Sequence, residues 1–286
     1  MISVIIPTYN RRLELKRTLD SLLSQSLKIG QDFEVVVVDD GSSDGSDQLV
    51  KSYGCLSYYL LKDRGFRVSK ARNIGAVMSE GENLIFIDSG VICHHDFIKS
   101  YKCKFDNDSG TSAFVGMVFG VYNNTEEYCS LLESINTSIA DDDLDRFKSA
   151  GVIDERVSIY NKCGYDIHNY PAPYYLFWSG NIGMRKDVFY KAGLFDESYT
   201  DWGGEDVDLG IRLYLGGVSI RLAEDCIVAH IPQLSKDPYN TEIVELKEKE
   251  LDEKYNLNCT KHTTIARSCG MDINSYLISK GVTEIA

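Results

Sequence analysis

Apolar runs alternate with amphipathic segments through the first 90 residues of the chain. Between the apolar runs, the spacing of leucines after Asn10, the turn at 39–44 and the segment 68–78 predict helices, the first of them capped by Asn10. The run at 33–38 is continuous, as in a parallel strand that is buried on both faces. This alternation predicts an α/β fold with a mostly parallel, doubly wound sheet and helices on both faces. The predicted strands occupy residues 2–6, 33–38, 56–61 and 83–87.

The middle of the chain, at 101–175, lacks this regularity, and the alternation returns at 176–232. The segment 241–257 is charged and has helical periodicity. We find no internal repeat and no low-complexity linker. The 286 residues are enough for one large domain or two small ones.

The composition argues against several classes of protein. The chain carries 30 Lys and Arg against 43 Asp and Glu, a net charge of −13, which argues against nucleic-acid binding. No stretch approaches the roughly 20 apolar residues of a membrane-spanning helix, and the first residues do not resemble a signal peptide. Eight cysteines are scattered without a C-x-x-C pair, so we expect reduced thiols in a cytoplasmic protein.

Carboxylates follow two of the predicted strands. Asp39 and Asp40 come directly after the second strand, and Asp88 follows the fourth. Ligands of such sheets bind outside the carboxyl ends of the strands, so these side chains are expected around one crevice. The alternative for Asp39 and Asp40 is a turn and a helix cap. Asp88 could bind Mg²⁺ or Mn²⁺, because both ions prefer oxygen ligands.

Four cations within nine residues stand out in a chain this acidic, and they could bind a diphosphate through forked hydrogen bonds. The alternative is a solvated basic face. A second group, Cys93–His94–His95–Asp96, looks like a metal site, but a helix start is the better interpretation. The four cations are Arg64, Arg67, Lys70 and Arg72.

Three carboxylates lie close together at 205–208, after Trp202 and two glycines. On a helix, Glu205 and Asp208 share a face, whereas Asp206 points elsewhere. Paired acids in a pocket can supply a general base, and the alternative is an acidic first helical turn. His230 follows an apolar run, where it is either a satisfied histidine or an additional ligand beside Asp88.

Together, these segments resemble family 2 of the inverting GT-A glycosyltransferases. The segment from 201 to 213, with His230, is similar to the carboxyl-terminal module shared by β-1,4-galactosyltransferases and chondroitin-polymerase-type enzymes. The similarity extends from residue 3 to about residue 232. The matching segments are SVIIPTYNR (3–11), VVVVDDGSSD (36–44), RGFRVSKARNIG (64–75), LIFIDSG (84–90), SGNIGMRKDVFYKAGLFDE (179–197) and DWGGEDVDLGIRL (201–213).

The resemblance implies a role for each matching residue. Asp206 would be the general base, and Glu205 would hold the acceptor or the donor sugar. Asp88, the first Asp of the family's D-x-D motif, and His230 would bind Mn²⁺ or Mg²⁺. The remaining residues would bind the nucleotide sugar: Pro7, Thr8 and Tyr9 at the nucleoside, Asp39 at the uracil with Asp40 beside it, Arg72 at the uracil or the diphosphate, Arg64 elsewhere on the donor, Ser89 near the ribose, and Trp202 and Gly204 at the sugar.

The sequence departs from the family pattern at Gly90, where the second Asp of D-x-D is usual. A metal would then rest on Asp88, diphosphate oxygens, waters and His230, an arrangement that Mg²⁺ tolerates because it keeps several waters. Alternatively, the metal site has decayed, and the cations of 64–72 carry the charge of the leaving group.

We therefore expect a metal-assisted, inverting transferase that moves a sugar from a UDP-sugar to a glycan, lipid-linked saccharide, peptide or small-molecule acceptor. The donor would bind the half at 1–100, and the acceptor would bind the half at 101–232. A helical tail at 233–286 could support a homodimer. The alternatives are a nucleotidyltransferase, which more often has a Gly-rich loop after its first strand, and a non-catalytic sugar-nucleotide-binding protein. The sequence selects neither the sugar nor the acceptor.

Overall fold

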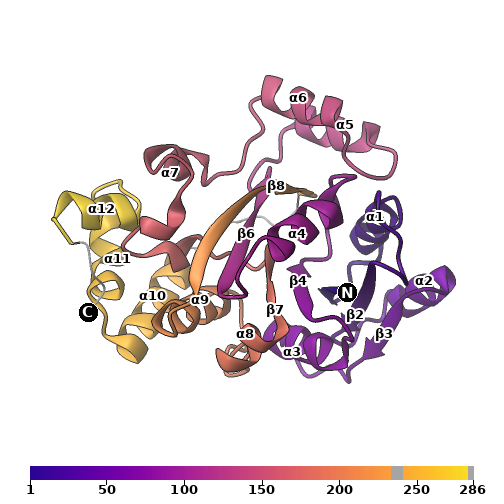
Figure 1. The fold of residues 1–286 in the computed structure, drawn as a ribbon, viewed down its shortest axis with the longest axis horizontal. Helices are drawn as coiled ribbons and strands as arrows, with labels where there is room; N and C mark the ends of the chain where they lie inside the picture. Colours follow the sequence, from indigo (N-terminus) through magenta and orange to yellow (C-terminus); the bar gives the residue numbers. More distant parts are fainter. Residues whose placement is uncertain (233–240, 283–286) are drawn as a thin grey trace.

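One mixed sheet of eight strands runs through the computed structural model of the chain, which describes residues 1–232 and 241–282 (Figure 1). The strand order is β3-β2-β1-β4-β7-β6-β8-β5. Strands β1 to β4 pair in parallel, and β6 pairs in parallel with β8, whereas β7 and β5 are antiparallel to their neighbours. The strands are β1 (Ile2–Thr8), β2 (Phe33–Asp39), β3 (Ser57–Leu60), β4 (Asn83–Ile87), β5 (Val91–Cys93), β6 (Ser112–Phe119), β7 (Asn181–Arg185) and β8 (Ser219–His230).

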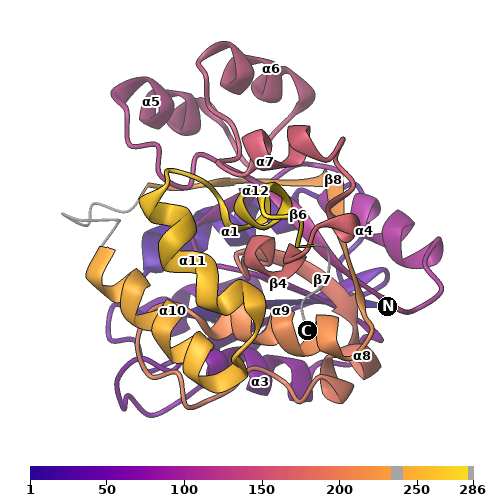
Figure 2. The same ribbon diagram turned by 90° about the vertical axis from the view of Figure 1, so that its left-hand side faces the viewer.

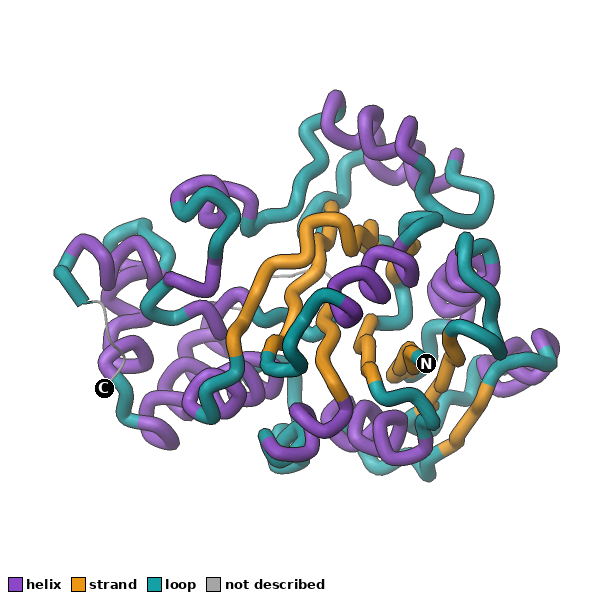
Figure 3. The backbone as a smooth tube through the Cα atoms, in the orientation of Figure 1, coloured by secondary structure: helices purple, strands orange, loops and turns teal. Residues whose placement is uncertain are grey.

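Helices pack against both faces of this sheet, as the central strands and peripheral helices of Figure 3 show. The α-helices are α1 (Arg12–Leu23), α2 (Ser46–Tyr53), α3 (Val68–Met78), α4 (Phe97–Asp106), α5 (Glu126–Ser134), α6 (Asp141–Ser149), α7 (Val157–Lys162), α8 (Lys186–Lys191), α9 (Glu205–Leu215), α10 (Thr241–Tyr255), α11 (Asn258–Ser268) and α12 (Ile273–Ser279). Two 3₁₀ turns, Ile167–Asn169 and Pro173–Leu176, precede β7.

Alternating side chains of the buried strands separate two cores. On β1, Val4 and Ile6 pack with the apolar residues of α1, α2 and α4, whereas Ile5 faces the opposite core. That second core includes residues of α3, α8 and α9 and extends to α10, α11 and α12, which lie side by side in Figure 2. Burying the central strands on both faces explains why their sequences are continuously apolar.

The predicted strands and helices of the first 90 residues are confirmed, and 68–78 and 83–87 coincide with α3 and β4. The predicted cap of α1 is wrong. Arg11 rather than Asn10 precedes α1, and Asn10 has a φ of +50° and accepts a hydrogen bond from the backbone N–H of Ser43. The first orphan N–H of the helix, on Arg12, instead donates to Asp44.

The irregular middle of the chain forms a lobe beside the sheet that contains α5, α6 and α7 (Figure 1). Arg17 of α1 donates hydrogen bonds to the carbonyls of Leu132 and Ile135, and residue Ile139 pairs with His94 as an isolated bridge. These contacts fix the lobe against the edge of the sheet that carries β5. Among the described residues, no helix combines the length and apolar character that crossing a bilayer requires.

Candidate active site

The carboxyl ends of β1 and β2 form one side of the site. Pro7 and Thr8 are buried at the end of β1, and Thr8 is paired with Asp39 of β2. Asp39 is fully buried, and its carboxylate accepts hydrogen bonds from the backbone N–H groups of Gly41 and Ser42 and from the hydroxyl of Tyr58. The turn expected from the sequence is therefore present, and it fixes the carboxylate that the sequence assigned to the nucleobase.

Asp40 lies beside Asp39 and forms an ion pair with Arg67, whose Nη2 is 2.5 Å from its Oδ1. Burial raises the pKa of Asp40, and Arg67 opposes that shift. Tyr9 is 46% exposed, and its hydroxyl donates to Asp63. This side of the site therefore combines the exposed ring of Tyr9 with the buried carboxylates of Asp39 and Asp40, both of which have hydrogen-bond partners.

Arg72 of α3 joins the two halves of the sheet. Its Nη2 donates to Asp88 at the end of β4, and its Nη1 donates to Glu205 at the start of α9, each over 2.9 Å. Its guanidinium also lies over the ring of Phe195, 5.1 Å from the centroid. Burial alone would lower the pKa of Arg72, but Asp88 and Glu205 outweigh it and raise that pKa, so the arginine stays charged. The guanidinium fixes two of the predicted site carboxylates relative to each other.

The neighbour of Arg72 on α3 holds the loop that leads to α9. Asn73 donates its amide N–H to the carbonyl of Phe195 and accepts a hydrogen bond from the backbone N–H of the same residue. This reciprocal pair ties α3 to a residue 122 positions later in the chain. Lys70, one turn earlier, remains substantially exposed.

The segment before α9 turns sharply to bring its carboxylates into the site. Gly204 has a φ of +92°, and a Cβ there would lie 2.9 Å from the ring of Tyr199, so a side chain would meet both strain and a clash. Trp202 is 53% exposed and leaves its indole available to a ligand. The glycine therefore allows the close approach that starts α9 at Glu205.

Asp206 has the environment of a proton acceptor. Among the described residues, only backbone N–H groups donate to its carboxylate: that of Val207 over 2.8 Å and that of Ser179 over a long 3.4 Å. Burial, and then the negative charge of Glu205, raise the pKa of Asp206 to about 7, against a smaller opposing effect of Arg72. A carboxylate with a pKa near neutrality is suited to general base catalysis.

Asp208 does not join this site, although it is two residues away. It is fully buried, and it accepts hydrogen bonds from Arg212 one turn later and from Lys254 and Tyr255 of α10. Glu205 and Asp208 are both buried, but Glu205 binds Arg72 while Asp208 anchors the carboxyl-terminal helices. In the acidic segment, Glu205 thus contacts the candidate site, whereas Asp208 contacts the carboxyl-terminal helices.

Asp88 and His230 lie together with Gly90 and Arg11 at the junction of β4, β5 and β8. Gly90 accepts a hydrogen bond from the backbone N–H of Ile231, next to His230. Burial lowers the pKa of His230, the charge of Asp88 raises it and that of Arg11 lowers it, so the imidazole is neutral near pH 7. Its Nδ1 is buried and has no hydrogen-bond partner among the described residues.

These donors fit a divalent cation. Arg72 uses Oδ1 of Asp88, and Oδ2 has no hydrogen bond to a described residue. A carboxylate oxygen and a neutral imidazole nitrogen are both ligands for first-row divalent metals. A buried imidazole nitrogen without a partner also requires an explanation, which a bound cation would supply.

Other predicted site residues lie at the margin. Ser89 is buried directly after Asp88. Arg64 is exposed in the loop before α3, and the structure gives it no hydrogen bond or ion pair with a described residue. A basic loop at 64–67 is present, but only Arg67 of its two arginines is tied to a site carboxylate, Asp40. The sequence does not single out Tyr58, which donates to Asp39, or Arg11, whose charge acts on His230. Arg11 does lie within the matching segment 3–11, whereas Tyr58 lies in none of the matching segments.

The histidine pair of the β5–α4 junction is separate from this site. His94 Nε2 lies 3.1 Å from Oδ1 of Asp141, and potential ligand atoms of His94, His95 and Asp141 lie within 4.8 Å of one another. The His94–Asp141 hydrogen bond ties the lobe to the sheet and accounts for the arrangement. Asp96 precedes α4, so the predicted helix start is confirmed.

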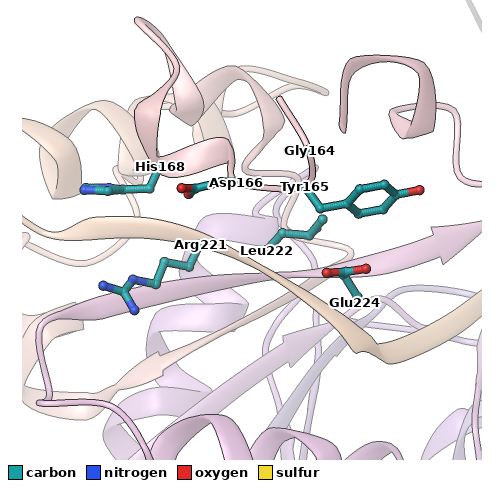
Figure 4. Close-up of a pocket in the computed structure, with 7 residues that line it drawn as sticks. All are labelled: Gly164, Tyr165, Asp166, His168, Arg221, Leu222 and Glu224. Atoms are coloured by element: carbon teal, nitrogen blue, oxygen red, sulfur yellow. The ribbon is translucent and has the colours of Figure 1, made fainter. Parts of the chain in front are cut away.

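Two surface cavities lie away from these groups. One, of about 360 Å³, separates Tyr165, Asp166 and His168 from Arg221 and Glu224 of β8 (Figure 4). The other, of about 340 Å³, lies beside the loop before Trp202 and is lined by residues such as Tyr199, Lys247 and Lys254. Both are polar and shallow, and the second adjoins the segment that leads into α9.

Comparisons with known proteins agree with this geometry. The model of glycosyl transferase family 2 matches residues 3–153, and a model described as the N-terminal domain of galactosyltransferase matches residues 161–234. Validoxylamine A glucosyltransferase of Streptomyces hygroscopicus subsp. jinggangensis (strain 5008) is 32% identical over 229 residues, which are 79% of this chain and 54% of that protein. The chondroitin synthase of Escherichia coli is 28% identical over 242 residues, 80% of this chain and 34% of that protein.

The fold is also shared with solved structures. The crystal structure of GalNAc-T7 with UDP, GalNAc and Mn²⁺ covers 84% of this chain and 46% of its own, with a TM-score of 0.57 and 18% sequence identity. The chain spans about half the length of the validoxylamine A enzyme and about a third of the chondroitin synthase. The predicted GT-A glycosyltransferase fold is confirmed.

Proposed function

Because the chain belongs to glycosyl transferase family 2, we propose that it transfers a sugar from a UDP-sugar to an acceptor hydroxyl with inversion at the anomeric carbon. The observation that carries this proposal is the bridge that the buried Arg72 makes between Asp88 and Glu205. That bridge brings the end of β4, where a donor diphosphate would lie, next to the base candidate on α9.

The half at 1–100 binds the donor in this proposal. Asp39, held by two backbone N–H groups and Tyr58, accepts hydrogen bonds from the uracil, and Tyr9 offers its exposed ring to the base. Pro7, Thr8, Asp40 and Ser89 shape the nucleoside pocket. A carboxylate that is already fixed is well suited to accept a hydrogen bond from the N–H of a pyrimidine, because the cost of ordering it is met before the ligand binds.

The half at 101–232 supplies the reaction. Asp206 takes the proton of the acceptor hydroxyl while the acceptor oxygen attacks the anomeric carbon and the bond to UDP breaks. Its pKa of about 7 favours it over Glu205, whose Oε1 is committed to Arg72. Glu205 instead accepts hydrogen bonds from sugar hydroxyls, and Trp202 and Gly204 border the sugar. A single base opposite the leaving group gives inversion, by the logic that separates inverting from retaining hydrolases.

Asp88 and His230 hold Mn²⁺ or Mg²⁺ in this proposal. The cation would neutralise negative charge on the diphosphate when bound. The solved structure of GalNAc-T7 contains Mn²⁺, and the partnerless Nδ1 of His230 supports the assignment here. Gly90 leaves the protein one carboxylate fewer than the D-x-D pattern supplies.

Acceptor, partner and location complete the proposal. The acceptor is a hydroxyl-bearing molecule of one of the classes glycan, lipid-linked saccharide, peptide or small metabolite, and the cavity between the loop at 198–201 and α10 adjoins its place. All eight cysteines are free, which is consistent with a cytoplasmic location. Helix α10 packs on α9 through the hydrogen bonds that Lys254 and Tyr255 donate to Asp208. We also propose that the protein forms a homodimer.

The test combines a donor panel with one substitution. Purified protein is incubated with UDP-, GDP- and dTDP-sugars and a panel of hydroxyl acceptors, and release of the nucleoside diphosphate is measured. We expect acceptor-dependent release of UDP by the wild type and its loss in Asp206→Asn, with UDP binding unchanged. Full activity of Asp206→Asn together with an inactive Glu205→Gln would transfer the base role to Glu205. Absence of UDP-sugar binding would reject the donor.

A further inference from the structure

Arg11 lies at the point where the D-x-D pattern is broken. A Cβ built on Gly90 would be 2.8 Å from Nη2 of Arg11 and 3.2 Å from its Cζ. These distances are shorter than ordinary van der Waals contacts, so the guanidinium fills the space that a side chain at 90 would enter. The glycine thus leaves room for a positive group where the family pattern has a carboxylate.

The backbone around Gly90 is fixed from two sides. Its N–H donates to the hydroxyl of Thr18 on α1, and its carbonyl accepts from the N–H of Ile231. Its φ of +115° suits glycine and strains other residues. Because Arg11 directly precedes α1, the same helix holds both Arg11 and the turn that it covers.

Arg11 has a partly buried guanidinium without a described partner, whereas two other arginines of the site are paired. Arg72 binds Asp88 and Glu205, and Arg67 binds Asp40. The structure gives the guanidinium of Arg11 no hydrogen bond or ion pair with a described residue, and its charge acts on the neighbouring His230. A partly buried cation without a counterion indicates an anionic ligand.

We propose that Arg11 binds the diphosphate of the nucleotide-sugar donor, in the space that Gly90 leaves open. This inference rests on the proposed function, which supplies the donor. A guanidinium pairs with phosphate oxygens through two parallel N–H donors and stays charged throughout the reaction. Arg11 accordingly stabilises the negative charge that develops on departing UDP and retains affinity for UDP when no divalent cation is bound.

The test measures UDP binding by calorimetry in EDTA, so that no metal contributes. We expect about tenfold weaker binding for Arg11→Gln, an intermediate loss for Arg11→Lys, and a change below about twofold for the control Arg12→Gln. Arg12 is the matched control because it is the exposed neighbour, it carries the same charge, and its backbone contact with Asp44 is retained. Equal UDP affinity of wild type and Arg11→Gln would overturn the inference.

A second pair of variants separates charge from backbone strain. Gly90→Asp and Gly90→Ala share the strained φ and a Cβ that meets the guanidinium of Arg11, but only the aspartate can pair with Arg11 and neutralise it. We expect Gly90→Asp to bind UDP more weakly than Gly90→Ala in EDTA, and Mn²⁺ to tighten its binding more. Identical behaviour of the two variants would also overturn the inference. A wild type that binds no UDP with or without Mn²⁺ would instead reject the proposed donor.

Discussion

The two sides of the crevice satisfy their polar groups to different degrees. At the end of β2, Asp39 accepts three hydrogen bonds and Asp40 is paired with Arg67. Near α9 and β8, by contrast, Oε2 of Glu205 and Nδ1 of His230 are buried without partners among the described residues. The two carboxylates of the side proposed for recognition are therefore paired before a ligand binds, although Thr8 Oγ1 and Arg67 Nε there are also buried without described partners. On the side proposed for chemistry, the atoms without partners belong to the candidate catalytic and metal-binding residues themselves.

The same contrast recurs within one turn of α9. Asp208 receives four side-chain donor atoms, from Arg212, Lys254 and Tyr255, and serves only the fold. Asp206 receives no side-chain donor among the described residues and has a pKa near 7. Two aspartates of identical chemistry thus differ in their surroundings, and we therefore expect them to differ in function, which the predictions below probe.

The largest expected effect is the loss of activity in Asp206→Asn. The amide has nearly the same shape but cannot take a proton, so we expect kcat to fall by about 10²- to 10⁴-fold. The free energy of unfolding should not fall, because the substitution removes a charge whose burial is unfavourable. Steady-state kinetics and urea denaturation measure the two quantities, and retained kcat would contradict the assignment of Asp206 as base.

The matched variant Asp208→Asn should show the opposite profile. Removing this buried carboxylate leaves Arg212 without its counterion and takes one of two from Lys254, which keeps Asp196, and breaking a buried pair costs on the order of 3–5 kcal/mol. We expect a lower midpoint of urea denaturation and, at a temperature where the variant is folded, a kcat within a few-fold of the wild type. A stable variant without activity would assign Asp208 to the chemistry.

The pH dependence of the reaction should reflect Asp206. Its carboxylate must be ionised to accept a proton, so kcat should rise about tenfold per pH unit below about pH 7 and level off above it. Stability should change in the other direction. Because the folded pKa lies above the unfolded value of about 3.9, the contribution of Asp206 to stability falls as pH rises from about 4 to 7. Asp206→Asn should remove that component, and an unchanged stability profile would contradict it.

A smaller effect is expected at Asp39, whose carboxylate accepts three hydrogen bonds. Tyr58→Phe removes one of the three hydrogen bonds to Asp39 and should cost about 1 kcal/mol of stability, with UDP binding weakened by no more than about fivefold. Thermal denaturation and calorimetric titration with UDP measure both. UDP binding that is weakened by far more than about fivefold would show that the position of the Asp39 carboxylate depends mainly on Tyr58 and not on all three donors.

The smallest effect is expected for Arg64→Gln. The sequence assigned Arg64 to the diphosphate, but its side chain is exposed and has no described partner in the structure. We expect KM for the donor to change by less than about twofold, as is usual for an exposed charge. A tenfold rise in KM would show that the loop at 61–67 folds over the donor when the donor binds.

Local sequence by itself determined the first half of the fold. The apolar runs at 2–6, 33–38 and 83–87 can be buried only as central strands, and the carboxylates that follow them must then meet at one edge of the sheet. Motif order along the chain was also enough to indicate the family, because several weak matches in a fixed sequence rarely coincide. The placement of Asp39 and Asp88 at strand ends was therefore predictable.

Only the tertiary structure decided what each charged residue does. Helical periodicity places Glu205 and Asp208 on one face, but it does not reveal that α3 supplies Arg72 to one and α10 supplies Lys254 to the other. Nor could it show that Arg11 covers Gly90, 79 residues later in the chain, or that Arg64 is exposed in the loop before α3. Charge pairing and pKa depend on distance and burial, and residues far apart in the sequence set both through the packing of the whole chain.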